Sequence, residues 1–318
     1  MSGRFSFSRT GARVHTLKNA SASGEKQRGG KSPHCFTAKE KDMTAINGTT
    51  RSADGTEIAF TAVGSGPGIV IVNGAMDYRN ARSTEAGLAR RLAGQHTVIT
   101  YDRRGRGESG PADPALTVDE AIQAEVGDIA ALIGQAGGTA AVLGFSSGGV
   151  LALHGVQAGL PITALALWEP PFVVGPSRPP LAPGYRERVQ QALADGRPGE
   201  AATLFFVEAC AFPEEAVEQM RAEPYWAGLE KLASSLPNDA AAMGDTMSGD
   251  FTTLQRFASI DVPTLVTYGA YAFPGFTEAA HAIAAVLPNA TARELPGDDH
   301  DVSPEHLADA LAEWLRQR

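Results

Sequence analysis

Residues 140–149 read Ala-Ala-Val-Leu-Gly-Phe-Ser-Ser-Gly-Gly, and the interpretation of the whole chain starts from them. The first four form a short apolar run, which is typical of a strand buried on both faces of a sheet. Gly144 and Gly148 flank Ser146 at two residues on either side, and an Ala- and Leu-rich segment follows. Because glycine has no Cβ, this spacing allows a sharp turn from strand to helix with Ser146 at its tip. The pattern predicts an exposed serine at the N-terminus of a helix, where backbone amides favour negative charge.

Other apolar runs of the same kind lie on both sides of this motif. They are Ile69–Val72, Thr97–Tyr101 and Ile162–Trp168. Two more strands are predicted at Pro263–Tyr268 and Ala290–Leu295, and a strand-like stretch Glu57–Val63 follows an Asp54-Gly55 hairpin turn. Helical patterns separate them, including residues 117–135, which begin with a Thr117 and Glu120 capping box, and a last helix from Ser303. This alternation predicts an α/β fold with a doubly wound, mostly parallel sheet. Ligands of such sheets bind at the carboxyl ends of the strands.

Two segments lie outside this pattern. Residues 1–42 carry nine Lys or Arg against three acidic residues and few apolar ones. We therefore expect residues 1–48 to be a disordered N-terminal extension, and Met43 is an alternative translation start to Met1. Residues 172–260 show no strand pattern but several short helical ones, which predicts a helical lid inserted into a core of residues 49–171 and 261–318.

Composition limits the function classes. The chain has 318 residues, 43% hydrophobic and 20% charged, as is ordinary for a globular protein. Its formal net charge of −9 argues against a nucleic-acid or anionic-membrane partner, because both require a basic face. Cys35 and Cys210 have no Cys or His at metal-ligand spacing, so neither a disulfide framework nor a zinc site is expected. With no apolar run long enough to span a bilayer, we expect a cytoplasmic protein that acts on a small molecule.

The motif around Ser146 and two others together resemble the α/β-hydrolase superfamily over about residues 50–317. Asn73-Gly74-Ala75-Met76 is similar to the family's His-Gly oxyanion segment, with Asn in place of His, and residues 102–109 (Asp-Arg-Arg-Gly-Arg-Gly-Glu-Ser) are similar to its structural D-x-R-G-x-G-x-S loop. The resemblance implies that Ser146 is a nucleophile and that the backbone N–H groups of Ala75 and Ser147 form the oxyanion hole. It implies no cofactor and no metal. Ser147 is the rival nucleophile but lacks the flanking glycine spacing.

His300 is the candidate general base among seven histidines. It follows the last predicted strand in a Leu-Pro-Gly-Asp-Asp-His loop, like the histidine of the family, and an imidazole can take the serine proton and return it to a leaving group. The others are less suitable: His15 and His34 lie in the extension, His96 precedes a strand, and His154, His281 and His306 lie on predicted helices.

The acid that orients the base departs from the family's commonest pattern. After Pro263–Tyr268 the chain reads Gly-Ala-Tyr-Ala-Phe-Pro, without the usual Asp. Some relatives, including certain haloalkane dehalogenases and zearalenone-type lactonases, carry the acid after the strand that corresponds to Ile162–Trp168. There this chain has Glu169, which we predict to bind the second ring nitrogen of His300. The rival acids are Asp298, Asp299 and Asp301, which lie beside the base.

Substrate contacts are harder to predict. Met76 and Phe145, next to the predicted catalytic residues, and Trp226, Met243 and Met247 of the lid are candidates, although buried Met and aromatic residues more often serve packing.

The combined expectation is a serine hydrolase that cleaves an ester, lactone or thioester through an acyl-enzyme intermediate. A serine at this turn argues against dehalogenase or epoxide-hydrolase chemistry, because those relatives use Asp there. Two alternatives remain: a non-hydrolytic enzyme with the same triad, such as a perhydrolase, lyase or cyclase, and a non-catalytic ligand receptor. The sequence does not specify the substrate or the oligomeric state.

Overall fold

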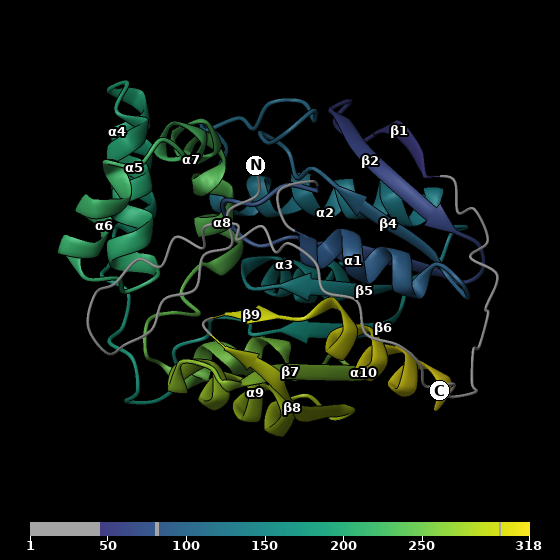
Figure 1. Cartoon of the computed structure of the whole chain (residues 1–318). Coiled ribbons are helices and arrows are strands. Elements are labelled where there is room, and N and C mark those ends of the chain that lie inside the picture. The colour runs from purple at the N-terminus through teal and green to yellow at the C-terminus, as the bar shows by residue number, and fades with distance from the viewer. Residues whose placement is uncertain (1–44, 80–82, 299) are drawn as a thin grey trace, which may run out of the picture.

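The computed structural model describes residues 45–79, 83–298 and 300–318, and in them a nine-stranded sheet runs through the molecule (Figure 1). The strands lie in the order β1-β2-β4-β3-β5-β6-β7-β8-β9. Their bounds are β1 Ile46–Arg51, β2 Glu57–Gly64, β3 Gly68–Val72, β4 Thr97–Tyr101, β5 Ala140–Phe145, β6 Ile162–Trp168, β7 Thr264–Tyr271, β8 Ala290–Asp298 and β9 Asp301–Val302.

The sheet is parallel in its centre and antiparallel at its edges. β4, β3, β5, β6, β7 and β8 run parallel, whereas β1 and β2 form a hairpin on one edge and β9 folds back on β8 at the other. The predicted mostly parallel sheet is therefore confirmed. Its crossover order places β3, β5 and β6 side by side, so the residues that follow these strands meet at one edge of the sheet.

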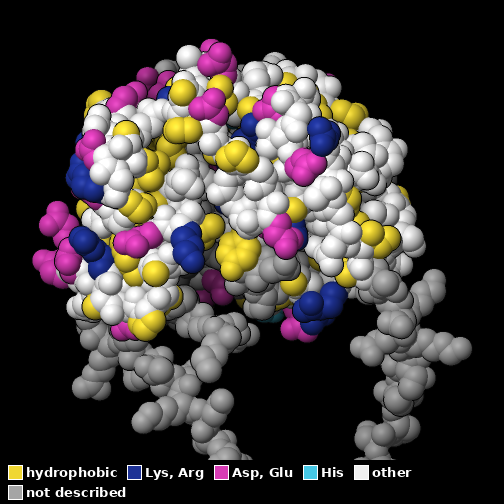
Figure 2. All heavy atoms as spheres, turned by 90° about the horizontal axis from the view of Figure 1, so that it is seen from above, with side chains coloured by type: hydrophobic (Ala, Val, Ile, Leu, Met, Phe, Trp, Pro, Cys, Tyr) yellow, Lys and Arg dark blue, Asp and Glu magenta, His cyan; other side chains and the backbone are white. Residues whose placement is uncertain are grey.

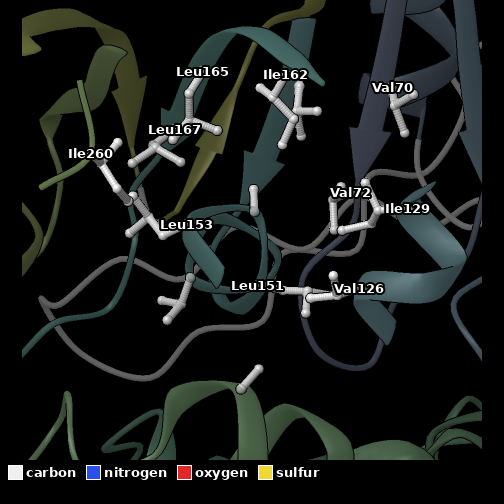
Figure 3. Close-up of a cluster of buried hydrophobic side chains, with 14 of the residues drawn as sticks. Val70, Val72, Val126, Ile129, Leu151, Leu153, Ile162, Leu165, Leu167 and Ile260 are labelled. Atoms are coloured by element: carbon white, nitrogen blue, oxygen red, sulfur yellow. The ribbon is translucent and has the colours of Figure 1, made fainter. Parts of the chain in front are cut away.

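Helices cover both faces of the sheet. α1 Ser83–Leu92 and α10 Pro304–Arg316 lie on one face, and α2 Val118–Gln135, α3 Ser147–Gln157 and α9 Pro274–Val286 lie on the other. Thr117 and Glu120 form the predicted capping box of α2, and Ser303 caps α10. Each face has its own apolar core because the central strands β3, β5 and β6 are buried on both sides. Figure 3 shows part of the larger core, where strand residues Val70, Val72, Leu165 and Leu167 meet Val126 and Ile129 of α2 and Leu151 and Leu153 of α3.

The chain between β6 and β7 is helical, as predicted. It contains α4 Tyr185–Ala194, α5 Pro198–Leu204, the π-helix η1 Phe205–Ala209, α6 Glu214–Arg221, α7 Trp226–Leu232, the 3₁₀ turn η2 Ala233–Ser235, α8 Leu236–Met243 and the 3₁₀ helix η3 Phe251–Phe257. Figure 1 shows α4 to α7 gathered beyond one end of the sheet. These helices share a separate apolar core, which also takes in Met76 from the segment after β3. The inserted helices therefore pack directly against the predicted oxyanion segment.

One boundary was predicted wrongly. β1 begins at Ile46 and pairs with Ala62 of β2, so the ordered chain starts before residue 49. Backbone pairing with β2 holds these residues in place, although their own sequence contains little apolar surface. The rest of the predicted extension, including Met43 and Cys35, lies outside the described residues.

Candidate active site

Ser146 lies at the turn between β5 and α3, and close backbone packing forces the shape of this turn. Its φ of 51° is in the left-handed region, and its N–H donates to the carbonyl of Trp168 at the end of β6 at 2.9 Å. A Cβ at Gly148 would come within 2.4 Å of the Val72 carbonyl, and one at Gly144 within 2.5 Å of the Gly149 Cα. The two motif glycines are thus required by backbone contact, and Ser146 remains half-buried among buried neighbours.

The segment after β3 lies against this turn. A Cβ at Gly74 would lie 3.0 Å from the Ser146 Cβ and 3.2 Å from the Phe145 carbonyl, so a larger residue would push the segment away from the serine. Ala75 follows and is half-buried, and Met76 has a φ of 58°. The predicted oxyanion segment is therefore a strained loop held beside the serine, opposite the N-terminus of α3.

Glu169 and His300 are in direct contact. Glu169 is fully buried directly after β6, and its Oε2 lies 2.5 Å from His300 Nδ1. Its Oε1 accepts a hydrogen bond from the backbone N–H of Gly269 at 2.9 Å. Both carboxylate oxygens are thus occupied, and the imidazole presents Nε2 as its other nitrogen. The structure brings together the two residues that the sequence paired.

The rival acids are placed differently. Asp301 Oδ1 accepts from the N–H of Val302 at 2.9 Å, and Asp298 pairs with Asp301 in the β8–β9 ladder. Asp299 lies outside the described residues.

His300 is held on three sides while its side chain stays 31% exposed. Besides the bond to Glu169, its ring stacks on Phe276 of α9 with centroids 4.5 Å apart and planes 9° from parallel. Its carbonyl accepts from the indole Nε1 of Trp168 at 3.4 Å. Phe276 was not among the sequence candidates. It lies on the first turn of the helix after β7, near where the family's usual Asp would be, and a single aromatic residue there carries no sequence signal.

Trp168 connects the serine to the histidine, because its carbonyl accepts from Ser146 and its indole donates to His300. Ser146 Oγ itself forms no hydrogen bond with the imidazole among the described residues. Such hydrogen bonds often close only when substrate binds.

Backbone strain concentrates at this site. Of the described non-glycine residues with positive φ, four belong to it: Met76, Ser146, Glu169 and His300, with φ of 58°, 51°, 44° and 67°. The fifth is Ala211 in the helical insert. Each such residue costs about 1–3 kcal/mol and persists only where the surroundings hold it, which is typical of functional sites. Backbone conformation, which was not used in the sequence analysis, therefore singles out residues that the sequence motifs also indicated.

The predicted structural loop after β4 does hold its neighbours in place. Asp102 accepts from the backbone N–H groups of Arg79 and Glu108 at 3.0 and 2.9 Å, and also from the Arg79 guanidinium at 3.0 Å. Arg104 donates to both carboxylate oxygens of Asp128 on α2, at 2.8 and 2.7 Å. Asp239 of α8 joins this loop through Arg103 and Arg106, and nothing in the sequence singled it out.

Two of the other histidines, His154 and His281, and the candidate substrate contacts pack against neighbouring residues. His154 Nε2 lies 2.9 Å from the Ala242 carbonyl, and burial lowers the pKa of its ring. His281 contacts Tyr268, and His306 is exposed on α10. The proposed substrate contacts Phe145, Trp226, Met243 and Met247 are all buried in apolar clusters, and substrate contact stays a prediction for each.

The described residues contain no group of three or more His, Cys, Asp or Glu side chains arranged to hold a metal. Within the same part of the chain, no helix has the length and apolarity needed to cross a membrane. On the face drawn in Figure 2, basic side chains stand singly among acidic and apolar ones.

Comparison with known proteins identifies the family to which this fold belongs. Residues 69–314 match the model of the alpha/beta hydrolase family, and the chain therefore belongs to that family. An alpha/beta hydrolase from Sphaerobacter thermophilus is 44% identical, with a TM-score of 0.74 over 84% of this chain and 100% of that one. A thermophilic esterase from Thermogutta terrifontis, solved with malate bound, is 25% identical, with a TM-score of 0.58 over 86% and 98% of the two chains.

Two further matches carry less information about this chain. The enol-lactonase from Burkholderia xenovorans is 19% identical over 84% of this chain and 99% of its own, with a TM-score of 0.59, and supports the fold alone. The polyketide synthase ThaQ from Burkholderia thailandensis is 30% identical over 76% of this chain, which spans only 11% of that protein.

Proposed function

We propose that this protein is a serine hydrolase that cleaves an ester, lactone or thioester of a small molecule through an acyl-enzyme intermediate. The observation that carries the proposal is the contact between His300 Nδ1 and the buried Glu169 carboxylate at 2.5 Å, with Trp168 hydrogen-bonded both to His300 and to the strained Ser146. A base whose Nδ1 proton is held by a carboxylate has a free Nε2 to accept a proton.

In the first half-reaction, Ser146 Oγ attacks the substrate carbonyl carbon and His300 Nε2 takes the hydroxyl proton. The carbonyl oxygen becomes an oxyanion, which the N–H groups of Ala75 and Ser147 stabilise. The tetrahedral intermediate then collapses: its bond to the leaving oxygen or sulfur breaks, and His300 gives that atom the proton. The product is an alcohol or thiol, or the open hydroxy-acyl chain of a lactone, and the acyl group stays on Ser146.

In the second half-reaction, water attacks the acyl carbon while His300 accepts one of its protons. Collapse of the second intermediate returns this proton to Ser146 Oγ and releases a carboxylic acid. Glu169 stabilises the imidazolium in both halves without itself becoming protonated. The esterase from Thermogutta terrifontis, 25% identical to this chain, supports esters as the first substrates to test.

The nucleophile is tested by labelling with a fluorophosphonate probe and locating the adduct by mass spectrometry. We expect an adduct on Ser146 that is absent from Ser146→Ala, while Ser234→Ala, an exposed serine of the helical insert, labels like the wild type. Labelling that is unaffected by Ser146→Ala would contradict the proposal.

The reaction type is tested with p-nitrophenyl esters of increasing acyl length, lactones and thioesters. We expect Ser146-dependent turnover, with one solvent oxygen in the acid product when the reaction runs in ¹⁸O-labelled water. Turnover without solvent oxygen would favour the non-hydrolytic alternative, and labelling without any turnover would favour a receptor.

A further inference from the structure

A buried cluster of four charged residues lies behind the oxyanion segment. Arg103 and Arg106 from the loop after β4 meet Glu125 of α2 and Asp239 of α8, and all four side chains are buried or nearly so. The charges balance, as buried charges must unless their pKa values shift. Asp239 is the member contributed by the helical insert, 93 positions after Ser146 in the chain.

Both arginines also bind backbone carbonyls of the oxyanion segment. Arg106 Nη1 donates to the carbonyls of Gly74 at 2.5 Å and Asp77 at 3.1 Å. Arg103 Nη1 donates to the carbonyl of Asn73 at 3.2 Å. These carbonyls bracket Ala75, whose N–H is the proposed oxyanion donor, and Met76, whose φ of 58° requires restraint. The two guanidinium groups thus hold a strained loop in one position.

Asp239 in turn holds both guanidinium groups. Its Oδ1 accepts from Arg103 Nη1 at 2.6 Å, and its Oδ2 accepts from Arg106 Nη2. Its Oδ1 also accepts the hydroxyl hydrogen of Ser147 at 2.8 Å. Ser147 carries the second proposed oxyanion donor on its backbone. The Asp239 carboxylate therefore contacts Ser147 directly and reaches the segment around Ala75 through Arg106.

The electrostatics favour a permanent anion here. Burial would raise the pKa of Asp239, but the charges of Arg103 and Arg106 outweigh it and keep that pKa below its usual value. A charged carboxylate that accepts three hydrogen bonds from groups on two other segments is held in one orientation, which suits a positioning role.

We propose that Asp239 is a positioning residue that sets the distance between the Ala75 and Ser147 N–H groups. It acts through Arg103, Arg106 and the Ser147 hydroxyl, without touching substrate. The inserted helices then contribute to catalysis and do more than cover the site. This inference rests on the proposed serine hydrolase function.

Two effects of removing the Asp239 charge oppose each other, and the experiment must separate them. Loss of positioning weakens the stabilisation of the oxyanion and lowers kcat. Loss of a nearby negative charge favours the oxyanion and raises kcat. Removing one oxyanion donor outright costs about 10²–10³ in kcat. Because displacement of two donors is a partial loss of each, we expect positioning to prevail.

The test compares kcat and KM for p-nitrophenyl ester hydrolysis in Asp239→Asn, Arg106→Lys and the control Asp128→Asn. Asn has the size of Asp but turns an N–H group towards a guanidinium donor. Lys keeps the positive charge of Arg106 but cannot reach both carbonyls at once. Asp128 is an equally buried carboxylate on α2 that binds Arg104 away from the oxyanion segment.

We expect kcat to fall about 10- to 100-fold in Asp239→Asn and Arg106→Lys with KM changed less than about threefold. The pH dependence of kcat/KM should keep its shape, because Glu169 and His300 are untouched. Asp128→Asn should lower the melting temperature while kcat stays within about twofold. If Asp239→Asn does not fold, Ser147→Ala replaces it, since it removes the hydroxyl bond to Asp239 and a longer one from Arg103 Nη1 at 3.5 Å while both charges stay, and kcat should then fall several-fold.

A kcat within twofold of wild type in folded Asp239→Asn and Arg106→Lys would overturn the inference, and so would a rise in kcat or an equal loss in Asp128→Asn. Failure of the proposed function is seen separately, because the wild type would then show no labelling and no turnover that depend on Ser146.

Discussion

Replacing Glu169 with Gln exchanges one carboxylate oxygen for an amide nitrogen beside His300, and the structure fixes which way the new amide turns. The backbone N–H of Gly269 donates to Oε1 at 2.9 Å, so the amide of Gln must keep its oxygen there. Its NH₂ group then faces His300 Nδ1, where a carboxylate oxygen now lies at 2.5 Å. Two donors cannot share that contact. The imidazole must therefore become an acceptor at Nδ1 and carry its proton on Nε2, which faces away from Glu169.

This tautomer cannot accept the serine proton, so the expected loss is large. An equivalent acid-to-amide change in a serine protease lowers kcat about 10⁴-fold with the geometry intact. At about 1.4 kcal/mol per tenfold, this loss raises the barrier by about 5 kcal/mol. Hydrolysis of a p-nitrophenyl ester and the rate of fluorophosphonate labelling should both fall, because both need a deprotonated Ser146. KM should change little.

A matched control is available on α9. Glu278 is a half-buried carboxylate that accepts from Ser177 at 2.5 Å, and Glu278→Gln should retain the wild-type rate. Glu169→Asp keeps the charge but shortens the side chain, and we expect a rate between those of the wild type and Glu169→Gln. A folded Glu169→Gln enzyme with a kcat within tenfold of wild type would refute this reasoning and assign the acid role to another carboxylate.

Three further predictions follow from single contacts. Gly148→Ala places a Cβ 2.4 Å from a backbone carbonyl and should lower the free energy of unfolding in urea by about 3 kcal/mol or more. Gly149→Ala, whose nearest contact would be 3.3 Å, should stay near the wild-type stability. Equal losses of stability in the two variants would contradict the backbone argument. Because burial lowers the pKa of His154, protonation from about pH 6.5 downwards favours the unfolded chain, and the melting temperature should fall between pH 7.5 and 5.5. His154→Gln should reduce that fall and the exposed His306→Gln should not; an unchanged fall in His154→Gln would show that other groups cause it. Phe276→Leu removes the ring stacked on His300, and since aromatic pairs contribute about 0.5–1.5 kcal/mol, kcat/KM should drop up to about tenfold. Phe276→Tyr keeps an aromatic ring and should recover the wild-type kcat/KM. A wild-type kcat/KM in Phe276→Leu would exclude a positioning role for Phe276.

Most of the sheet could be predicted because its signal is local. Strands buried on both faces must be apolar at nearly every position, and β3, β4 and β6 span the predicted runs. β7 and the largely exposed edge strand β8 continue a few residues beyond their predicted bounds. The missed start of β1 has the opposite cause. Ile46–Arg51 is an edge strand with little buried surface, so backbone pairing with β2 defines it rather than its own pattern.

In the candidate site, too, the residues with a local sequence signal were predicted, and the distances between them come only from the structure. Ser146 and His300 follow strands in recognisable loops, and Glu169 was found because the usual position after β7 holds no carboxylate. The structure supplies the contact between Glu169 and His300 at 2.5 Å, which no spacing along the chain can express.

The sequence by itself determined the central strands, their alternation with helices in the α/β fold and the serine at the glycine-flanked turn, since each depends on residues close together in the chain. Only the tertiary structure decided that Phe276 stacks on the imidazole and that Asp239 joins two arginines to the oxyanion segment. A buried Asp on a helix looks like any surface Asp in a sequence. Its role depends on which charged residues, distant along the chain, the packed helices bring within hydrogen-bond distance. Only the folded structure determines these neighbours.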